Sequence, residues 1–468
     1  MDLSTLGRGV RLAFREGVTV RGDGSDAVVV QLEDRQFVFT RHAPSVKRAI
    51  LRLAHGLAID DLCAGAYEEG GAPAMATILF YLDQFDNLGL IARHFLTSKG
   101  LFASYSSTAR RPLPACQIPA GSSTYTLSRF AFIRRAAGGI LLESPVAGGV
   151  VSIHDSRVLQ WLFILKDRVT YADAVAELLT HDVIAADDLA RLLISVGFVS
   201  EVTQAVPAMD DRDGLAQWEF HDLLFHSRSR DGRHGNRYGG SYPWLGWTPS
   251  APACRTSHSA SSLQLEVPTT EDNDPALFAT LAGRRSIRDY SSLPVTFKQI
   301  GDFLARTSRV SDFFPGDDEL TRRPYPSGGA RYPLELYLLS WRCDGLRRGL
   351  YHYDALHHSL SEIKTAPADL AVIHGDVATY ANRPAKWEAQ VVIIFSARFR
   401  RMSWKYESVA YSLILKEVGV LMQTMYLVAT AMHLSPCAVG GGDSDLFAQL
   451  AGLDYYEETA VGEFLLGN

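Results

Sequence analysis

The chain of 468 residues lacks several features that would assign a protein to a class at once. Its five cysteines are far apart in the sequence and include no Cys-x-x-Cys pair. We therefore expect neither a zinc site nor a disulfide framework, and we assign no metal. A formal net charge of −6 excludes the extended basic surface on which nucleic-acid binding depends.

Signals for export or membrane insertion are also missing. The opening stretch MDLSTLGRGVRLAF has no basic segment followed by an apolar one, so no export signal is expected. The longest apolar stretch, VGVLMQTMYLVATAMHL (418–434), contains polar Gln423 and Thr424 and predicts a buried core helix rather than a membrane span. Together these features favour a cytoplasmic protein that binds neither membrane nor nucleic acid.

What the sequence does contain is a repeated order of elements in its first 200 or so residues. Residues 8–97 show short alternating runs typical of hairpin strands and then three runs with helical spacing, and residues 124–202 repeat that order. The pattern predicts two tandem winged-helix-like modules, over 1–100 and 120–203. Any small α+β domain would give a similar pattern, so this alternative stays open.

The composition changes at about residue 204. A short helix is predicted in WEFHDLLFHSRS (218–229), and the next stretch is rich in glycine, arginine and aromatic residues without a steady period. We interpret 204–270 as a linker or wrapping segment and 271–468 as a third domain. The predicted helices of that domain lie near 276–284, 296–307 and 406–433, and its predicted strands lie near 333–341, 350–353 and 388–397.

Two stretches of the third domain are suited to binding a cofactor. GRRSIRDY (283–290) places three arginines and a serine within two turns, as donors for a phosphate or a flavin edge, although a solvated basic helix end is about as well supported. PSGG (326–329) leaves backbone N–H groups open to a flat ring, or simply makes a tight turn into a strand.

Two further stretches complete the set. SPCAVGGGDSD (435–445) is another glycine-rich turn, placed after the long apolar helix. RMSWKYESVAY (401–411) contains adjacent Lys405 and Tyr406, which could accept and donate a proton, or which belong to a solvated face.

The order of these stretches resembles one family. RRSIRDY, RPYPSGGARYPLELYL, GLYHYDALHHSL, KYESVAY and PCAVGGGDSD, preceded by WEFHDLLFHSRSRDGR, resemble the SagB/ThcOx-type azoline dehydrogenases of thiazole- and oxazole-modified peptide (RiPP) pathways. The resemblance covers 210–468 in sequence. Over 1–203 it is one of architecture, since tandem winged-helix-like units are similar to leader-peptide recognition elements. It implies an α+β chain whose C-terminal nitroreductase-like FMN domain has a mainly antiparallel central sheet flanked by helices.

The resemblance also implies roles for individual residues. The Arg-x-Ser-x-Arg element would hold the phosphate, ribityl chain and pyrimidine edge of FMN with Arg284, Arg285, Ser286 and Arg288. The Pro-Ser-Gly element would pack on the flavin bound mainly by the other subunit of a homodimer, through Pro326, Ser327 and Gly328. The turn after the central helix would approach flavin N5 with Pro436, Ala438, Val439 and Gly440, and the family's Gln is kept as Gln423. Lys405 and Tyr406 match the active-site pair.

The implied activity is oxidation of thiazoline or oxazoline rings to azoles in a ribosomal precursor peptide, after a YcaO-type cyclodehydratase has formed the rings. A hydride would go to flavin N5, a protein base would take the proton, and oxygen would reoxidise the flavin. Two other functions stay open: an NAD(P)H-dependent nitro or quinone reductase, and a non-catalytic peptide-binding scaffold with a decayed flavin domain. The N-terminal modules would bind the leader peptide, or serve as spacers or docking surfaces.

The chain also departs from the family pattern. Val409, Ser412, Val420 and Thr424 stand where other residues are often found. The Lys-x-Arg phosphate clamp of simple nitroreductases is absent from the C-terminal ETAVGEFLLGN. Holding of the phosphate would then rest on the arginines of 284–288, or on others such as Arg398 or Arg400.

Overall fold

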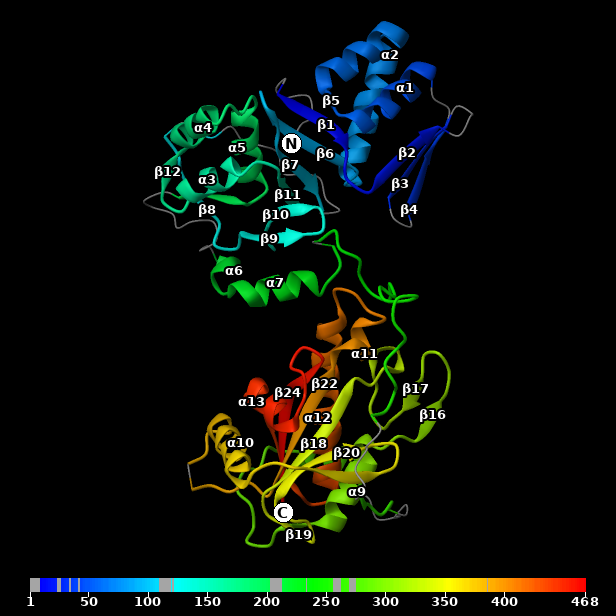
Figure 1. The fold of residues 1–468 in the computed structure, drawn as a ribbon, viewed down its shortest axis with the longest axis vertical. Helices are drawn as coiled ribbons and strands as arrows, with labels where there is room; N and C mark the ends of the chain where they lie inside the picture. The colour runs from blue at the N-terminus through cyan, green and yellow to red at the C-terminus, as the bar shows by residue number, and fades with distance from the viewer. Residues whose placement is uncertain are drawn as a thin grey trace. The chain divides into compact units, whose positions relative to one another are not determined.

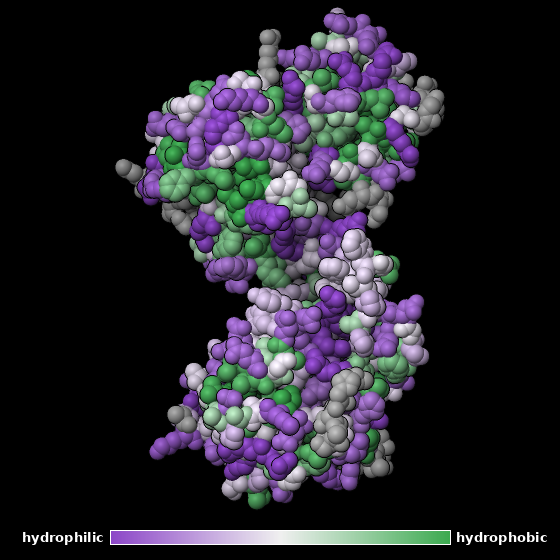
Figure 2. All heavy atoms as spheres, in the orientation of Figure 1, coloured by the Kyte–Doolittle hydropathy of each residue, from purple (hydrophilic) through white to green (hydrophobic). Residues whose placement is uncertain are grey.

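The computed structural model describes residues 9–22, 27–32, 35–40, 43–108, 119, 122–202, 213–232, 234–255, 262–268, 275–384 and 386–468. Residue contacts divide the chain into two compact units, Met1–Asn236 and Arg237–Asn468 (Figure 1). On the face seen in Figure 2, hydrophilic side chains cover most of each unit, with smaller apolar areas between them. This division falls inside the predicted wrapping segment, and the module limits at 100, 120 and 203 stay predictions.

The first unit contains one strand arrangement twice. β1 (Val10–Phe14) lies between β5 (Leu57–Ala58) and β6 (Ile91–Thr97), with antiparallel pairing on both sides. In the same way, β8 (Thr124–Leu127) lies between β12 (Val169–Thr170) and β13 (Val199–Val202). The repeated order of elements is therefore confirmed, while the winged-helix class stays a prediction.

A three-stranded antiparallel meander follows the first strand of each half. The meanders are β2 (Val18–Gly22), β3 (Val28–Leu32) and β4 (Arg35–Phe39), then β9 (Phe132–Ala136), β10 (Gly139–Glu143) and β11 (Gly149–Ile153). The helices after them are α1 (Pro44–Arg52) and α2 (Ile59–Asn87), then α3 (Arg157–Ile164), α4 (Tyr171–Thr180) and α5 (Ala186–Ser195). Gly71, with φ 68° and ψ −168°, interrupts α2 just before Pro73, so the first half also contains the three predicted helical segments.

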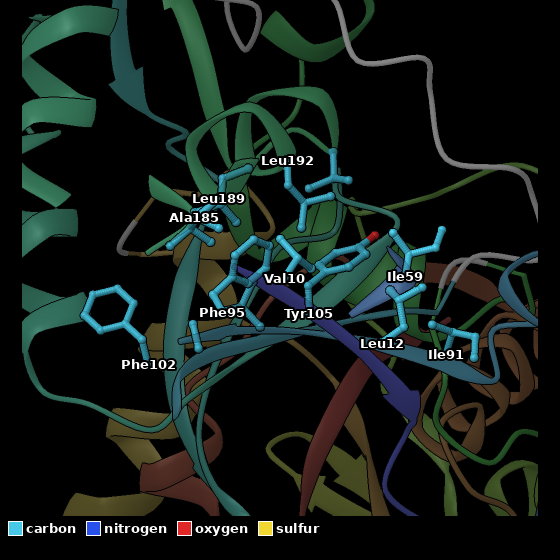
Figure 3. Close-up of a cluster of buried hydrophobic side chains, with 14 of the residues drawn as sticks. Val10, Leu12, Ile59, Ile91, Phe95, Phe102, Tyr105, Ala185, Leu189 and Leu192 are labelled. Carbon is cyan, nitrogen blue, oxygen red and sulfur yellow. The ribbon is translucent and has the colours of Figure 1, made fainter. Parts of the chain in front are cut away.

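The two halves are joined by a strand that the sequence pattern did not predict. β7 (Gly100–Ser107) pairs with β6 and with β11, which gives a seven-stranded sheet in the order β5-β1-β6-β7-β11-β10-β9. Figure 3 shows Val10, Phe95 and Tyr105 of this sheet beside Leu189 and Leu192 of α5. One hydrophobic core therefore spans both halves. β6 and β7 are buried along most of their length, and so they lack the alternation by which strands are recognised.

The second unit is built around an antiparallel sheet in the order β14-β21-β20-β18-β22-β24-β23. Its strands are β14 (Ser262–Gln264), β18 (Leu334–Ser340), β20 (Gly349–Asp354), β21 (Ser359–Ile363), β22 (Val391–Arg398), β23 (Ser435–Val439) and β24 (Glu458–Gly467). Leu336 and Leu338 belong to a core with α9 (Phe297–Ser308) and α12 (Ala410–Ala431). Tyr337 and Leu339 belong to a second core with α10 (Pro367–Tyr380) and α13 (Ser444–Ala451). Helices thus cover both faces, as predicted.

Short elements complete both units: α6 (Asp213–Ala216), α7 (Phe220–Arg228), α8 (Leu277–Gly283), α11 (Phe399–Ser403), the hairpin β16 (Asp312–Phe314) and β17 (Leu320–Arg322), and the parallel pair β15 (Val295–Thr296) and β19 (Cys343–Asp344). The short helix predicted at 218–229 is confirmed as α7. Among the described helices, α12 alone is long and apolar enough to cross a membrane by length and composition. Its Ile414, Leu421 and Met425 are buried in the core, as expected for a core helix.

Candidate functional site

The predicted site residues that make specific contacts gather at two places along α12. The arginine cluster comprises Arg284, Arg285, Ser286, Arg288, Tyr426 and Ala438. The lysine–tyrosine cluster comprises Ser327, Gly328, Gly329, Lys405, Tyr406 and Glu417. Leu413, which packs against Gly328, and Tyr426 mark the two places, which a rise of about 1.5 Å per residue puts roughly 20 Å apart along the helix.

Tyr426 organises the arginine cluster. Its hydroxyl accepts a hydrogen bond from the Ala438 N–H (2.8 Å) and lies 2.7 Å from the Ser286 hydroxyl. Because the Tyr426 oxygen accepts from Ala438, its own hydrogen is free to point at Ser286. The Arg284 guanidinium lies 5.1 Å from the centroid of the Tyr426 ring, a cation–π contact. The sequence did not identify Tyr426, since an aromatic residue in a core helix predicts packing only.

The arginines next to Ser286 have donors to spare. Neither Arg285 nor Arg288 forms an ion pair with an acidic residue in the described part of the chain, and the Arg288 Nε is buried without a hydrogen-bond partner there. Arg383 lines the same hollow and is paired with Asp289. Guanidinium groups that are close together and unpaired suit a phosphate or another dense anion. The residues present therefore fit the phosphate end of FMN.

The third predicted cofactor element lies in a strand rather than a turn. Pro436, Ala438 and Val439 belong to β23, an edge strand paired with β24, and Gly440 follows the strand end. The pairing explains the difference, because the C-terminal stretch ETAVGEFLLGN forms the partner strand. β23 is also fixed to the arginine cluster, since the Ile287 N–H donates to the Pro436 carbonyl (2.8 Å).

In the lysine–tyrosine cluster, Ser327 and the two glycines sit directly against other site residues. The Ser327 hydroxyl donates to Glu417 Oε2 (2.6 Å) and accepts from the Tyr332 N–H (2.8 Å). Gly329 has φ 63°, and a Cβ there would lie 2.6 Å from the Tyr406 hydroxyl and 2.9 Å from Lys405 Nζ. The glycine turn therefore makes room for these two side chains in the same chain.

Lys405 and Tyr406 lie in the loop before α12, and the prediction that they begin this helix was wrong. Ser408 has φ 62°, a left-handed conformation that an α-helix cannot contain, and α12 begins only at Ala410. The Lys405 Nζ lies 5.5 Å from the ring centroids of both Tyr406 and Tyr242. These ring faces attract its positive charge and fix the position of the ammonium.

Part of the predicted wrapping segment holds this loop in place. We call residues 237–248 the strap. Gly239 and Glu407 exchange backbone hydrogen bonds of 3.2 and 3.0 Å, and the Trp404 indole N–H donates to the Thr248 carbonyl (2.8 Å). The strap therefore orders the loop that carries the Lys-Tyr pair. Sequence reasoning did not foresee this contact, because the strap has no periodicity from which to read it.

Glu417 is a titratable residue that the sequence analysis did not select. Its side chain is buried beneath the Ser327 turn, and its Oε1 has no hydrogen-bond partner among the described residues. Burial raises the pKa of Glu417 to about 7, against the opposing effects of the Ser327 hydrogen bond and the Arg323 charge. This carboxyl group can therefore change its charge near neutral pH.

The remaining predicted residues lie apart from these clusters or have other partners. Pro326, Gln423 and Arg400 are exposed. Arg398 does not face the arginine cluster: its Nε contacts Glu335 (2.9 Å), and its terminal nitrogens donate to the carbonyls of Pro252 and Ala253. Arg398 is therefore unavailable for the phosphate. At the positions that depart from the family, Val409 and Ser412 are buried, Val420 is exposed, and the Thr424 hydroxyl bonds to the Val420 carbonyl (3.0 Å).

Comparisons with known proteins agree with this architecture. Residues 281–467 match the nitroreductase family, so the second unit carries a nitroreductase-like domain, an oxidoreductase fold. Residues 125–235 match the cyanobactin oxidase ThcOx, and this match reaches into the second repeat, where the sequence analysis had found only a likeness of architecture. The chain is thus a SagB/ThcOx-type protein with a nitroreductase-like domain.

Three relatives illustrate the range. MJ1384 of Methanocaldococcus jannaschii, named as a nitroreductase, is 29% identical over 179 residues, which are 38% of this chain and 84% of that protein. The trifolitoxin-processing protein TfxB of Rhizobium leguminosarum bv. trifolii is 26% identical over 204 residues, 43% of this chain and 54% of that protein. The microcin B17-processing protein McbC of Escherichia coli is 28% identical over 151 residues, 31% of this chain and 54% of that protein. The chain therefore spans about half the length of each processing protein.

One solved structure in the comparison contains a peptide. The Escherichia coli microcin synthetase McbBCD complex with truncated pro-MccB17 bound matches over 52% of this chain and 90% of that chain, at 18% identity and a TM-score of 0.34. A likeness of this size carries no argument beyond the family matches.

Proposed function

We propose that this protein is an FMN-dependent oxidase that converts thiazoline or oxazoline rings to azoles in a ribosomally made peptide. The observation that carries the proposal is the meeting of Lys405 and Tyr406 at Gly329, inside the nitroreductase-like unit of a chain with a ThcOx match. Two relatives are named for processing trifolitoxin and microcin B17, which supports a peptide substrate over a small molecule.

The arginine cluster would hold the cofactor. The spare donors of Arg285 and Arg288 suit the phosphate, and Arg284 and Ser286 are fixed by Tyr426 to face the remainder of the molecule. When bound, FMN supplies a two-electron acceptor. The protein's own part is to orient this acceptor, exclude water around it and manage the proton that the ring loses.

Lys405 and Tyr406 would contact the azoline ring. Their functional ends are adjacent at Gly329, one with ammonium donors and the other with a hydroxyl that donates and accepts. The strap and the two tyrosine rings fix the loop before any substrate arrives, and such preorganisation lowers the cost of orienting reactants.

We also propose a homodimer. The arginine cluster and the Pro-Ser-Gly element lie about 20 Å apart along one α12, so they would bracket the same cofactor most simply if they came from two chains. Tyr411, Leu415 and Val420 expose apolar surface on α12, which such a dimer would cover. The expected solution state is a dimer with one FMN per chain.

The ring-bearing peptide needs an earlier enzyme and a docking site. A cyclodehydratase of the YcaO type would form the azolines, since this chain can only oxidise them. The N-terminal unit offers exposed edge strands at β4 and β9, to which a leader peptide could add as a further strand. Spacer or partner-docking roles for this unit are the competing explanations.

One observation favours a second function. The match to MJ1384 covers most of that protein, and it is compatible with an NAD(P)H-dependent nitro or quinone reductase. The ThcOx match outside the nitroreductase-like domain speaks for the peptide oxidase. A scaffold with a decayed flavin domain would bind peptide without any cofactor.

One experiment separates the three functions. The purified chain is examined for visible absorption and FMN content, and then mixed without oxygen with either a thiazoline peptide or NADH. Bleaching by the peptide, with loss of two hydrogens from its mass, supports the oxidase, and bleaching by NADH alone supports the reductase. A colourless chain that does not take up added FMN leaves the scaffold. Lys405→Ala and Tyr406→Phe should keep FMN and lose peptide oxidation, with Lys364→Ala as a control outside both clusters.

A further inference from the structure

The Gly440–Gly442 turn borders a hollow of the second unit that the proposed roles leave unused. The hollow is lined by Tyr411 and Met422 of α12, by Ala438, by the three glycines, and by Val461 and Glu463 of β24. No lysine, arginine or histidine lines it, and Glu463 is its only carboxylate. A single acidic group in a hollow without cations is an arrangement that ordinary surface packing does not require.

The hollow adjoins the cofactor residues. Ala438 lines it and also donates its N–H to the Tyr426 hydroxyl of the arginine cluster. Opposite, β24 carries an extra residue: Phe395 pairs with Gly462 and Ser396 pairs with Ala460, so Val461 forms a β-bulge. Bulges of this kind redirect side chains and are common beside active sites.

Glu463 is buried and unsatisfied. Its side chain is 5% exposed, and it forms no ion pair or hydrogen bond with the described residues. Asp376 and Tyr380 of α10, Tyr411 of α12 and Asp443 before α13 are the titratable groups on neighbouring elements. None of them is a cation. Burial, reinforced by the charge of Asp376, raises the pKa of Glu463 to about 7.

The glycines of this turn are shaped to this carboxyl. A Cβ at Gly442 would overlap the Glu463 carboxylate, and one at Gly441 would lie 2.8 Å from the Tyr380 ring. Substitution at Gly442 would thus displace the carboxyl from the hollow. The triple glycine, which the sequence analysis treated as weak support for a cofactor turn, has a second explanation in the placing of this acid.

We propose that Glu463 is the group that accepts the proton of the azoline ring. This inference rests on the proposed function. One ring C–H bond breaks with its electron pair leaving as hydride to the flavin. The proton from the neighbouring ring position binds a Glu463 carboxylate oxygen, and the electrons of that bond complete the azole. The neutral acid then returns its proton to water through the open hollow.

The other candidates for this proton are placed less well. The Lys405 ammonium lies over two tyrosine rings, a contact that suits a cation orienting the substrate. Glu417 is hydrogen-bonded to Ser327 and does not line the hollow. Glu463 alone combines a carboxyl group, an opening and the absence of a competing partner among the described residues.

The test uses the full-length FMN-loaded chain and a synthetic peptide with one thiazoline. Glu463→Gln keeps the shape and removes the acid, Glu463→Asp keeps the acid, and Glu457→Gln is the control at an exposed residue outside the hollow. Glu463→Gln should slow single-turnover oxidation about 10²–10⁴-fold, the usual contribution of a general base. It should also abolish the rise of rate between pH 6 and pH 8, roughly the range in which an acid with pKa near 7 ionises. Glu463→Asp should keep that rise at a lower rate, and FMN content should stay at the wild-type level in all three.

A readout without turnover accompanies it. In the FMN-free chain, difference infrared spectra against Glu463→Gln should show a carboxyl that ionises near neutral pH in the wild type and in Glu457→Gln. Wild-type rates and pH profile in Glu463→Gln would overturn the inference and leave the oxidase proposal standing, as would a carboxyl that is already ionised at pH 5. A wild-type chain that binds FMN and oxidises no azoline peptide would overturn both.

Discussion

The two clusters on α12 are built in opposite ways. In the lysine–tyrosine cluster the Ser327 hydroxyl, the Gly329 turn and the ends of Lys405 and Tyr406 contact one another, and the strap closes over their loop. In the arginine cluster, Arg285 and Arg288 face a hollow without a described acidic partner. The first is preorganised within one chain, whereas the second is complete only when an anion binds. The difference indicates which cluster positions reacting groups and which one holds a cofactor.

The largest effect should follow from removing the unpaired cations. Arg285→Ala with Arg288→Ala deletes two charged donors, and each hydrogen bond to a charged group contributes roughly 1.5–3 kcal/mol. We expect FMN affinity to fall at least 100-fold with little change in melting temperature, measured by fluorescence titration with FMN. The control is Arg347→Ala, which removes an exposed arginine paired with Glu362. Unchanged affinity in the double variant would mean that the comparison assigns the wrong cluster to the cofactor.

The next effect concerns pH, because buried carboxyls lie at both places. Burial raises the pKa of Glu417 and of Glu463 to about 7, above their ordinary values. Their contribution to stability is therefore fully present below about pH 4.5 and is lost as pH rises through 7. Each carboxyl should lower the free energy of unfolding by roughly 3 kcal/mol between these limits. Urea unfolding of Glu417→Gln at pH 5 and pH 8 should show a smaller decrease than the wild type, and an equal decrease would contradict the assignment.

A third prediction tests the preorganised cluster. Gly329→Ala places a Cβ against Lys405 and Tyr406 and also strains a residue with φ 63°. We expect peptide oxidation to fall about 100-fold, roughly 2.7 kcal/mol of transition-state stabilisation, with FMN still bound. Gly328→Ala is the matched control, since its Cβ would meet Leu413 at an ordinary 3.4 Å. If both variants lose the same activity, contact with the Lys-Tyr pair is not the reason.

The sequence predicted more of the fold than of the site. Helical and alternating periodicity predicted the repeated element order of the first unit and the central strands and helices of the second. β6 and β7 escaped because their buried residues show no alternation. The union of both halves in one sheet escaped because strand pairing across the repeats has no local signal.

For the site, local motifs found residues but not their partners. The Arg-x-Ser-x-Arg and Ser-Gly-Gly elements were recognisable by spacing, while Tyr426, Glu417 and Glu463 came from elements distant in sequence. Each of these three gains its meaning from a contact made by the fold: a hydroxyl beside Ser286, a carboxyl under Ser327, a carboxyl against Gly442. A lone Glu or Tyr in an apolar helix or strand predicts none of them.

The smallest effect should come from the residue that links the arginine cluster to β23. Tyr426→Phe keeps the ring under Arg284 and removes the hydroxyl shared by Ser286 and the Ala438 N–H. The loss of neutral hydrogen bonds should lower the free energy of unfolding by about 1–2 kcal/mol and FMN affinity only a few-fold, measured by urea unfolding and FMN titration. Tyr411→Phe, on the exposed part of α12, is the control. A loss of affinity as large as that of the double arginine variant would show that the hydroxyl itself binds the cofactor, and the arginine cluster would then be organised around Tyr426 rather than around its cations.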